Sequence, residues 1–355
     1  MKKCVINHGK TALVHALLKN YLQTAQLLYK GGADLNLNLI YAAKRGFPKM
    51  VTYLLEQGAD HSWITENQET PLILAALAQN YKSAEILLGN GADPNWTDHN
   101  SLSPLNHAVM NGDMSMVKLL LNHSADPNTS GVQGNTALMN AVSHGYPLIA
   151  LKLLQSGAHV NAINQTGQTA LMLAASKGYR ETVKLLHQHS ASIDTQDLNE
   201  RNALIHAASN GKSLVVQYLL EEDADYQVNA LDLQGNGGSA LIHAARGGHL
   251  DVLRLLLMKT VNINEVELTQ RRTALMEASI RGHRESVNLL IDHGADLNLT
   301  DFRGQTVLGL AVSRGHHEIS RDLLARGANS QEKDRNANNL LHLAANNGDL
   351  PIIEM

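Results

Sequence analysis

The sequence predicts an all-α protein made of short helix pairs that stack one on the next. The first observation is a pattern copied along all 355 residues, a leucine placed three residues before an alanine. The second is the spacing of apolar residues within each copy, which indicates two short helices. The third is glycine at the ends of these helices, where the chain needs a positive φ. Because one short helix pair cannot bury its own apolar face, stacking must supply the core.

Eleven leucines anchor the pattern, and we number the repeats one to eleven accordingly. They are Leu13, Leu39, Leu72, Leu105, Leu138, Leu171, Leu204, Leu241, Leu275, Leu308 and Leu341. The spacings between them are 26, 33, 33, 33, 33, 33, 37, 34, 33 and 33 residues. A period sustained over the whole chain indicates a repeat architecture rather than two or three unrelated domains.

Repeat six shows the order of elements within one copy. Thr169 is placed to cap a first helix that begins at Ala170. Gly178 stands where that helix ends, and apolar residues at helical spacing in 182–186 predict the second helix. The loop that follows a second helix is clearest at 294–298, which reads Gly-Ala-Asp-Leu-Asn. Each copy is therefore predicted as turn, helix, tight turn, helix and loop.

These residues resemble the ankyrin repeat. The signature is T-A-L-x-x-A-A, as in 169–175, together with G-A-D-x-N, as in 294–298, at 33-residue spacing. The resemblance covers essentially residues 4–355 and implies one array over residues 1–355. It also implies a right-handed solenoid of antiparallel helix pairs, with β-hairpin finger loops on one side. We call the segment three to nine residues before each anchor leucine the finger of that repeat.

Four departures from the period carry information. The first gap of 26 residues predicts that the finger between repeats one and two is missing. The gap of 37 residues predicts a longer, mobile finger within Tyr226–Gly238, and the gap of 34 adds one residue within Val261–Arg272. The last repeat stops at 350–355, midway through its second helix, so we expect natural sequence to follow Met355.

Composition argues against several classes of protein. Twenty-nine Lys and Arg against 33 Asp and Glu give a net charge of −4, whereas a general nucleic-acid or membrane-surface binder is normally basic. No stretch approaches the roughly 18 apolar residues of a membrane helix, and the N-terminus lacks the apolar segment of a signal peptide. The single cysteine, Cys4, excludes an internal disulfide framework and fits a reducing, cytoplasmic location.

The sequence contains no complete catalytic or metal-binding motif, and we expect no cofactor. Cys4 has no base fixed nearby, no phosphate-binding G-x-x-x-x-G-K-[ST] exists, and His316-His317-Glu318 is only part of a zinc motif. His187 and His189 lack a third ligand. Four histidines share the position two residues after the anchor. Repeats about 8–10 Å apart cannot share a zinc ion between such residues, so we expect most of these histidines to bond to a neighbouring loop. They are His15, His107, His206 and His243.

The aspartates of the Gly-Ala-Asp loops recur too regularly to form a catalytic pair. We expect their side chains to hydrogen-bond the backbone of the next loop. They are Asp34, Asp60, Asp93, Asp126 and Asp296, of which Asp126 follows Ser-Ala instead of Gly-Ala.

Two features point to a partner on the concave side that the resemblance implies. Trp63 and Trp96 occupy the same repeat position at the roots of consecutive fingers, and tryptophan is enriched at interface hot spots. The alternative is that each indole covers the helix pair beneath it.

The second feature is a row of arginines at the predicted concave positions of repeats seven to eleven, interrupted by Glu277. Lys44 and Arg45 mark a smaller basic spot on repeat two. Acidic residues gather instead in the second helices, which predicts a basic groove suited to carboxylates or phosphates. The alternative is a solvated polar face. The arginines are Arg201, Arg246, Arg272, Arg281, Arg303, Arg314 and Arg335.

The leading hypothesis is an intracellular protein-interaction scaffold without catalysis, whose concave face binds a protein partner, in part an acidic segment. The first alternative is the recruiting array of a larger enzyme whose catalytic domain follows residue 355. A variant is a bacterial effector that acts in a host cytosol. Nucleic-acid binding through the arginine row is a third class, and the acidic balance of the chain argues against it.

Overall fold

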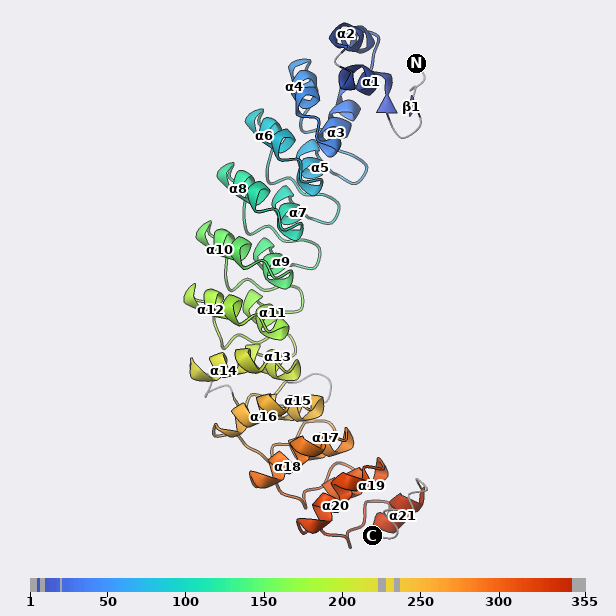
Figure 1. The fold of residues 1–355 in the computed structure, drawn as a ribbon, viewed down its shortest axis with the longest axis vertical. Coiled ribbons are helices and arrows are strands. Elements are labelled where there is room, and N and C mark those ends of the chain that lie inside the picture. The colour runs from blue at the N-terminus through green and yellow to red at the C-terminus, as the bar shows by residue number, and fades with distance from the viewer. Residues whose placement is uncertain (1–4, 7–9, 20, 223–227, 233–236, 347–355) are drawn as a thin grey trace. The chain divides into compact units, whose positions relative to one another are not determined.

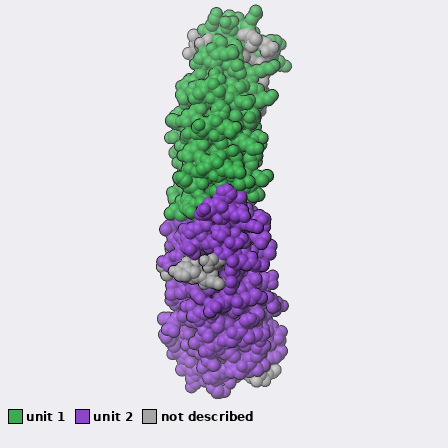
Figure 2. Space-filling view, turned by 90° about the vertical axis from the view of Figure 1, so that its left-hand side faces the viewer, with its two compact units in different colours: residues 1–165 green, residues 166–355 purple. Residues whose placement is uncertain are grey.

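The computed structural model describes residues 5–6, 10–19, 21–222, 228–232 and 237–346. Within them the chain forms 21 helices and one two-stranded hairpin, which confirms the predicted all-α fold (Figure 1). The chain divides into two compact units, residues 1–165 and residues 166–355 (Figure 2).

Unit 1 contains repeats one to five. A hairpin of β1 (Val5–Ile6) and β2 (Lys10–Thr11) precedes them, with antiparallel pairing of Val5 with Thr11. The first helices are α1 (Ala12–Leu18), α3 (Leu35–Arg45), α5 (Pro71–Leu77), α7 (Pro104–Met110) and α9 (Ala137–Ser143). The second helices are α2 (Leu22–Lys30), α4 (Pro48–Glu56), α6 (Tyr81–Gly89), α8 (Met114–Asn122) and α10 (Pro147–Gln155).

Unit 2 contains repeats six to eleven. The first helices are α11 (Ala170–Lys177), α13 (Ala203–Ser209), α15 (Ala240–Gly247), α17 (Ala274–Ile280), α19 (Val307–Ser313) and α21 (Leu340–Asn346). The second helices are α12 (Arg180–Gln188), α14 (Ser213–Glu221), α16 (Leu250–Leu257), α18 (Arg284–Asp292) and α20 (His317–Ala325). In each unit the odd-numbered helices form one layer and the even-numbered helices the other (Figure 1).

The ends of α11 follow from the residues that the sequence places there. The Oγ1 of Thr169 accepts the N–H of Met172 at 3.3 Å, as predicted for the cap. Gly178 ends the helix at φ +82°, and a Cβ on it would lie 2.8 Å from Cδ of Lys212. Glycine is therefore required at this position both for its conformation and for the close approach of the next repeat.

The anchor leucines form the centre of each layer. The ten from Leu13 to Leu308 are at most 1% exposed, and the alanine pair of α11, Ala174 and Ala175, is fully buried. Small side chains here let the two layers of short helices approach closely. Leu341 differs, with 57% exposure, and the structure describes no helix after its own helix α21.

The departures from the period fall in the loops. Only residues 31–34 join α2 to α3, and Asp34 caps α3 directly by accepting the N–H of Leu37 at 3.0 Å. The finger of repeat nine closes from the N–H of Glu267 to the carbonyl of Arg272, one residue wider than the Asp301-to-Gln305 closure of repeat ten. The long finger predicted within Tyr226–Gly238 lies partly outside the described residues, and the end of repeat eleven, at 350–355, lies wholly outside them.

Candidate functional site

Several of the fingers are tight turns held by a carboxylate. In repeat four the N–H of Asp98 donates to the carbonyl of Leu102 at 3.0 Å. Oδ1 of Asp98 accepts the N–H of Asn100 at 2.8 Å and that of Leu102 at 3.0 Å. Asp197 and Asp301 repeat this arrangement in unit 2. The aspartate therefore shapes the finger, and the residues at the tip remain available to solvent.

Backbone hydrogen bonds also link neighbouring finger tips within each unit. In unit 1 the N–H of His99 donates to Asn67 at 3.0 Å, and that of Val132 donates to Asn100 at 3.1 Å. In unit 2 the N–H of Arg335 donates to Arg303 at 3.0 Å. These bonds give the fingers a fixed spacing, so side chains on successive tips present one continuous surface.

Three of the four histidines at the shared position bond to a finger, as predicted. Nε2 of His107 lies 2.9 Å from Oδ2 of Asp98, and the pairs His206–Asp197 and His243–Asp232 have the same distance. Burial lowers the pKa of His206, although the hydrogen bond to Asp197 acts in the opposite direction. The imidazole is therefore a neutral structural group in the folded state. His15 is exposed.

The Gly-Ala-Asp loops are joined in a different way from the predicted one. Oδ1 of Asp126 accepts the N–H of Asn128 at 2.9 Å, within its own loop, and Asp60, Asp93 and Asp296 make the equivalent bond. The bond between loops comes from an asparagine, because Oδ1 of Asn95 accepts the N–H of Asp126 at 2.7 Å. The prediction that the aspartate side chain bonds the next loop was wrong, since a short Asx turn satisfies that carboxylate locally.

The arginine row divides into two groups, and the first group is paired internally. Glu277 is only 2% exposed and contacts two of these arginines. Its Oε2 lies 3.1 Å from Nε of Arg246, and its Oε1 lies 3.6 Å from Nη1 of Arg272. Arg272 also approaches the buried Asp301 at 3.9 Å. Arg201 pairs with Asp197 of its own finger at 3.4 Å. These three guanidinium groups therefore form ion pairs within the folded chain.

The second group is exposed. Arg281 and Arg314 follow the C-terminal ends of α17 and α19, and Arg303 and Arg335 lie on the fingers of repeats ten and eleven. Within the described ranges no carboxylate lies within 4.0 Å of these four guanidinium groups. Arg335 lies over the ring of Phe302, 5.1 Å from its centroid. We call Arg281, Arg303, Arg314 and Arg335 the basic surface.

The tryptophans and the smaller basic spot lie in unit 1. Nε1 of Trp96 donates to the carbonyl of Gln68 on the finger before it at 2.9 Å, while 40% of the side chain stays exposed. Trp63 is partly buried. Lys44 and Arg45 are exposed at the end of α3, and Arg45 lies 5.7 Å from the ring centroid of Tyr41. Trp96 therefore has a structural contact in addition to its exposed face.

The second helices of unit 2 carry balanced charge. Arg284 pairs with Asp322 at 2.6 Å, and its guanidinium holds the pKa of that carboxyl below the ordinary value. Arg321 pairs with Glu318 at 2.8 Å, and Arg326 with Asp292 at 2.6 Å. Three of the acidic residues in the second-helix layer of unit 2 therefore have arginine partners.

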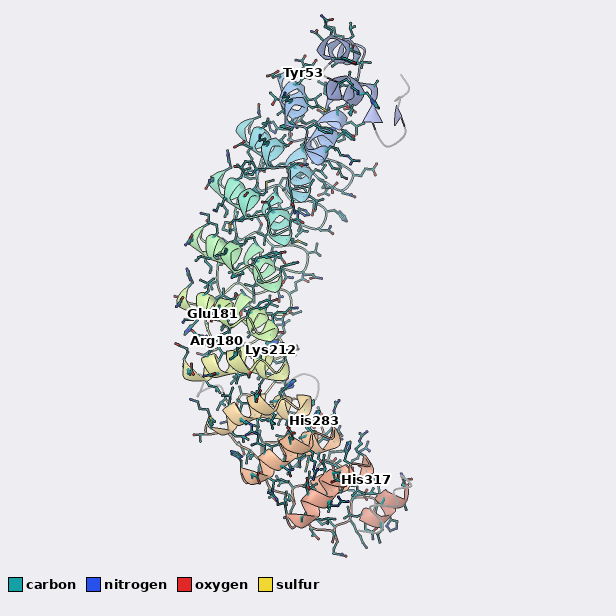
Figure 3. The ribbon with its side chains drawn as sticks, viewed as in Figure 1. Tyr53, Arg180, Glu181, Lys212, His283 and His317 are labelled. Atoms are coloured by element: carbon teal, nitrogen blue, oxygen red, sulfur yellow. The ribbon has the colours of Figure 1, made fainter. Side chains whose placement is uncertain are left out.

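No group of three or more potential metal ligands occurs among the residues that the structure describes. Nδ1 of His187 lies 2.9 Å from the hydroxyl of Tyr218, and His189 bonds to the carbonyl of Leu185. His283 lies at the start of α18 (Figure 3), and its Nε2 is 3.2 Å from the carbonyl oxygen of Arg246. Cys4 lies outside the described residues.

Sequence reasoning missed the role of Glu277. This residue stands two positions after Leu275, where His107 and His206 stand in their own repeats. That alignment was the available signal, because the position is buried in those repeats. Glu277 therefore neutralises two arginines rather than merely interrupting a basic row.

Comparisons with known proteins agree with this architecture. A model of three ankyrin repeats matches residues 37–98, 80–164, 150–230 and 226–301, and a single ankyrin repeat matches 303–335. Ankyrin repeat and SAM domain-containing protein 6 of Mus musculus is 35% identical over 95 residues, 26% of this chain and 11% of that protein. The B-cell lymphoma 3 protein homolog of Mus musculus is 37% identical over 95 residues, 27% of this chain and 20% of that protein.

A plant relative is similar over a shorter stretch. The probable E3 ubiquitin-protein ligase XBOS32 of Oryza sativa subsp. japonica is 36% identical over 85 residues, 22% of this chain and 17% of that protein. The chain thus matches a fifth or less of the length of these three relatives. In addition, none of the helices in the described ranges combines the length and apolar character needed to cross a bilayer.

Proposed function

Because this chain belongs to the ankyrin repeat family, we propose that it is a scaffold that binds a partner protein through its fingers and first helices. Ankyrin repeats are protein–protein interaction modules and are generally not catalytic themselves, and stacked repeats present extended binding surfaces. We place the principal contact on the basic surface, on the side that the family resemblance predicts to be concave. Lys44, Arg45, Trp63 and Trp96 form a second contact in unit 1.

The observation that carries the proposal is the division of the arginine row. Three arginines are neutralised by buried carboxylates, whereas the four exposed guanidinium groups of the basic surface have no such partner among the residues that the structure describes. A guanidinium presents paired N–H donors that fit a carboxylate in a bidentate geometry. An acidic segment of a partner protein supplies this chemistry at several points along an extended chain.

The test is replacement of Arg281 and Arg314 by alanine in the same chain. Each exposed ion pair contributes about 0.2–1 kcal/mol, so the double variant should weaken binding of an affinity-purified partner by about 2- to 30-fold at low salt. The difference should shrink as salt is added, because exposed charges are screened. Titration calorimetry with the purified partner at two salt concentrations measures both effects.

The matched control replaces Arg254 and Arg321, which lie on second helices, and should leave affinity unchanged. Arg246 is unsuitable for this test, because removing it takes the nearer of two arginines from the buried Glu277, and breaking a buried ion pair costs about 3–5 kcal/mol of stability. Equal affinity of the Arg281/Arg314 variant and the parent at low salt would remove the basic surface from the proposal.

A second candidate is the recruiting arm of a larger enzyme. One observation favours it. The similar plant protein is described as a probable ubiquitin ligase, and the part that resembles this chain is only 17% of its length. In this case the repeats would hold a substrate and another domain would act on it. The mass of the natural gene product, followed by a ubiquitin-transfer assay on it, separates this candidate from a scaffold alone.

A further inference from the structure

Unit 1 contains an open pocket of about 250 Å³ between the fingers of repeats four and five and the helices α7 and α9. Leu102, Met110 and Val132 supply its apolar lining, and Met110 and Val132 remain 38% and 58% exposed. Asn100, Gln133 and Asn140 supply side-chain amides. The pocket lies apart in sequence from the basic surface, which belongs to unit 2.

The pocket arises because repeat five lacks the carboxylate and imidazole of its neighbour. Repeat four has Asp98 seven residues before its anchor and His107 two residues after it, 2.9 Å apart. The same two positions of repeat five hold Gly131 and Asn140, and both residues line the pocket. A Cβ on Gly131 would lie 2.8 Å from Cδ2 of Leu102, which shows that Leu102 packs against the bare glycine. Two uncharged residues thus line the pocket at the positions where repeat four has a hydrogen-bonded pair.

The chemistry of the lining restricts what the pocket accepts. None of the lining residues is ionisable, so a charged group would lose hydration without gaining a partner. The side-chain amides of Asn100, Gln133 and Asn140 make no hydrogen bond to any described residue. Each amide offers N–H donors and a carbonyl acceptor, the same groups that a peptide bond presents.

The volume of the pocket further limits which ligands it can hold. An engineered apolar cavity of about 150 Å³ holds one benzene molecule, and small-molecule sites begin near 300 Å³. A volume of about 250 Å³ therefore fits one apolar side chain with its flanking peptide groups.

We propose that this pocket binds an uncharged aliphatic side chain, of leucine size, on an extended segment of a partner protein. Leu102, Met110 and Val132 cover the side chain, and the three amides hold the peptide groups on either side of it. The inference goes beyond the basic surface, because it uses neutral chemistry in a different unit and stands whether or not the arginines bind a partner.

The test uses the whole chain with labelled methyl groups and a capped peptide, N-acetyl-Ala-Leu-Ala-amide, as the probe. Titration should give saturable shifts in the methyl signals of Leu102, Met110 and Val132. Val132→Asp should weaken probe binding at least about 10-fold, because the aspartate places a charge at the apolar wall. Asn140→Leu should weaken binding as well, and leucine suits this position because Leu74 and Leu173 occupy it in repeats three and six.

The matched control is His99→Asp, which places the same charge at the same finger position of repeat four, outside the pocket lining. It should leave the dissociation constant of the probe within about two-fold of the parent. Methyl spectra of each variant without probe show that it is folded. The proposal is overturned if these three methyl signals show no saturable shift, or if Val132→Asp and His99→Asp change binding equally. The Arg281/Arg314 variant should bind the probe like the parent, so the two proposals fail independently.

Discussion

His206 illustrates how the charge state of one residue depends on its place in the fold. Its ring is buried beside the carboxylate of Asp197, and that carboxylate also forms an ion pair with Nη2 of Arg201 at 3.4 Å. Burial is the largest cause of its lowered pKa, because a charged imidazole would lose its hydration. The hydrogen bond to Asp197 opposes this shift and the positive charge of Arg201 adds to it.

This lowered pKa predicts a loss of stability in mild acid. The unfolded chain binds a proton at its ordinary histidine pKa, near 6.5, whereas folded His206 resists protonation, so stability falls as pH drops below that value. We expect His206→Leu to reduce the decrease in melting temperature between pH 7.5 and pH 5. The measurement is thermal unfolding followed by circular dichroism across this range, with His99→Leu, at an exposed finger tip, as the control. Identical pH profiles for His206→Leu and the parent would contradict the assignment.

Whether an arginine is free or paired was beyond sequence reasoning. The repeat position correctly placed Arg246 and Arg281 at the ends of the first helices of repeats eight and nine. It did not show that Glu277, 31 residues after Arg246, comes within 3.1 Å of that side chain. Such a contact depends on the rise and rotation between stacked repeats, which a one-dimensional pattern does not contain.

The helix α19 departs from the other first helices by containing a glycine at an interior position. Gly309 is buried in the middle of the helix, where glycine costs about 0.5–1 kcal/mol relative to alanine. The nearest atoms to an added Cβ would be Cδ1 of Leu343 at 3.6 Å and Oγ1 of Thr306 at 3.8 Å, both ordinary contacts. There is therefore room for a methyl group.

We expect Gly309→Ala to stabilise the protein by about 0.5–1 kcal/mol, measured by urea unfolding. The matched control is Gly178→Ala, which should destabilise the protein, because φ is +82° there and the new Cβ would meet Lys212 at 2.8 Å. A destabilised Gly309→Ala variant would show that the neighbouring helix α21 packs more tightly against α19 than these distances indicate.

Element boundaries were largely accessible from the sequence, since caps and glycines mark them. Thr169 and Gly178 begin and end α11 as expected. Sequence-based placement of helix ends fails where a residue other than glycine adopts a positive φ. Gln79 follows the first helix of repeat three at φ +58°, at the position where repeat two has Gly46 at φ +69°. The tight turn between α5 and α6 is closed by the N–H of Asn80 on the carbonyl of Ala75 at 2.8 Å, and the identity of residue 79 does not signal the conformation that this turn needs.

At the scale of the whole molecule, the contacts are local, because within each unit a helix packs mainly against the helices of its own repeat and of the adjacent ones. Stability in such an array is close to a sum of local terms. A defect in one repeat should therefore remain local, although the period of 33 residues makes all repeats look alike in sequence.

Leu105→Ala tests this locality. It removes a fully buried side chain from α7 and should cost about 2–5 kcal/mol. Hydrogen exchange should accelerate in α5 to α9, which pack against or adjoin this helix, and stay unchanged in α17 to α19. Exchange followed by mass spectrometry after proteolysis resolves these segments. Equal acceleration in both regions would show that the array opens as one cooperative body.

The net charge of −4 gave no indication of where binding chemistry lies. It adds paired charges, such as Arg284 with Asp322, to charges such as Arg281 and Arg314 that have no ion pair within the described part of the chain. The neutral pocket of repeat five contributes nothing to the sum. The division of the arginine row and the pocket became visible only when neighbours in space were known.

The position of the two indole rings has a practical consequence. Trp63 and Trp96 are the only tryptophans in the chain, and both belong to unit 1. Tryptophan fluorescence, excited at wavelengths that tyrosine does not absorb, is thus an optical probe confined to the first 165 residues, whereas circular dichroism records helices along the whole array. Recording both signals in a single denaturation experiment separates the melting of one half from that of the other without any dye or label.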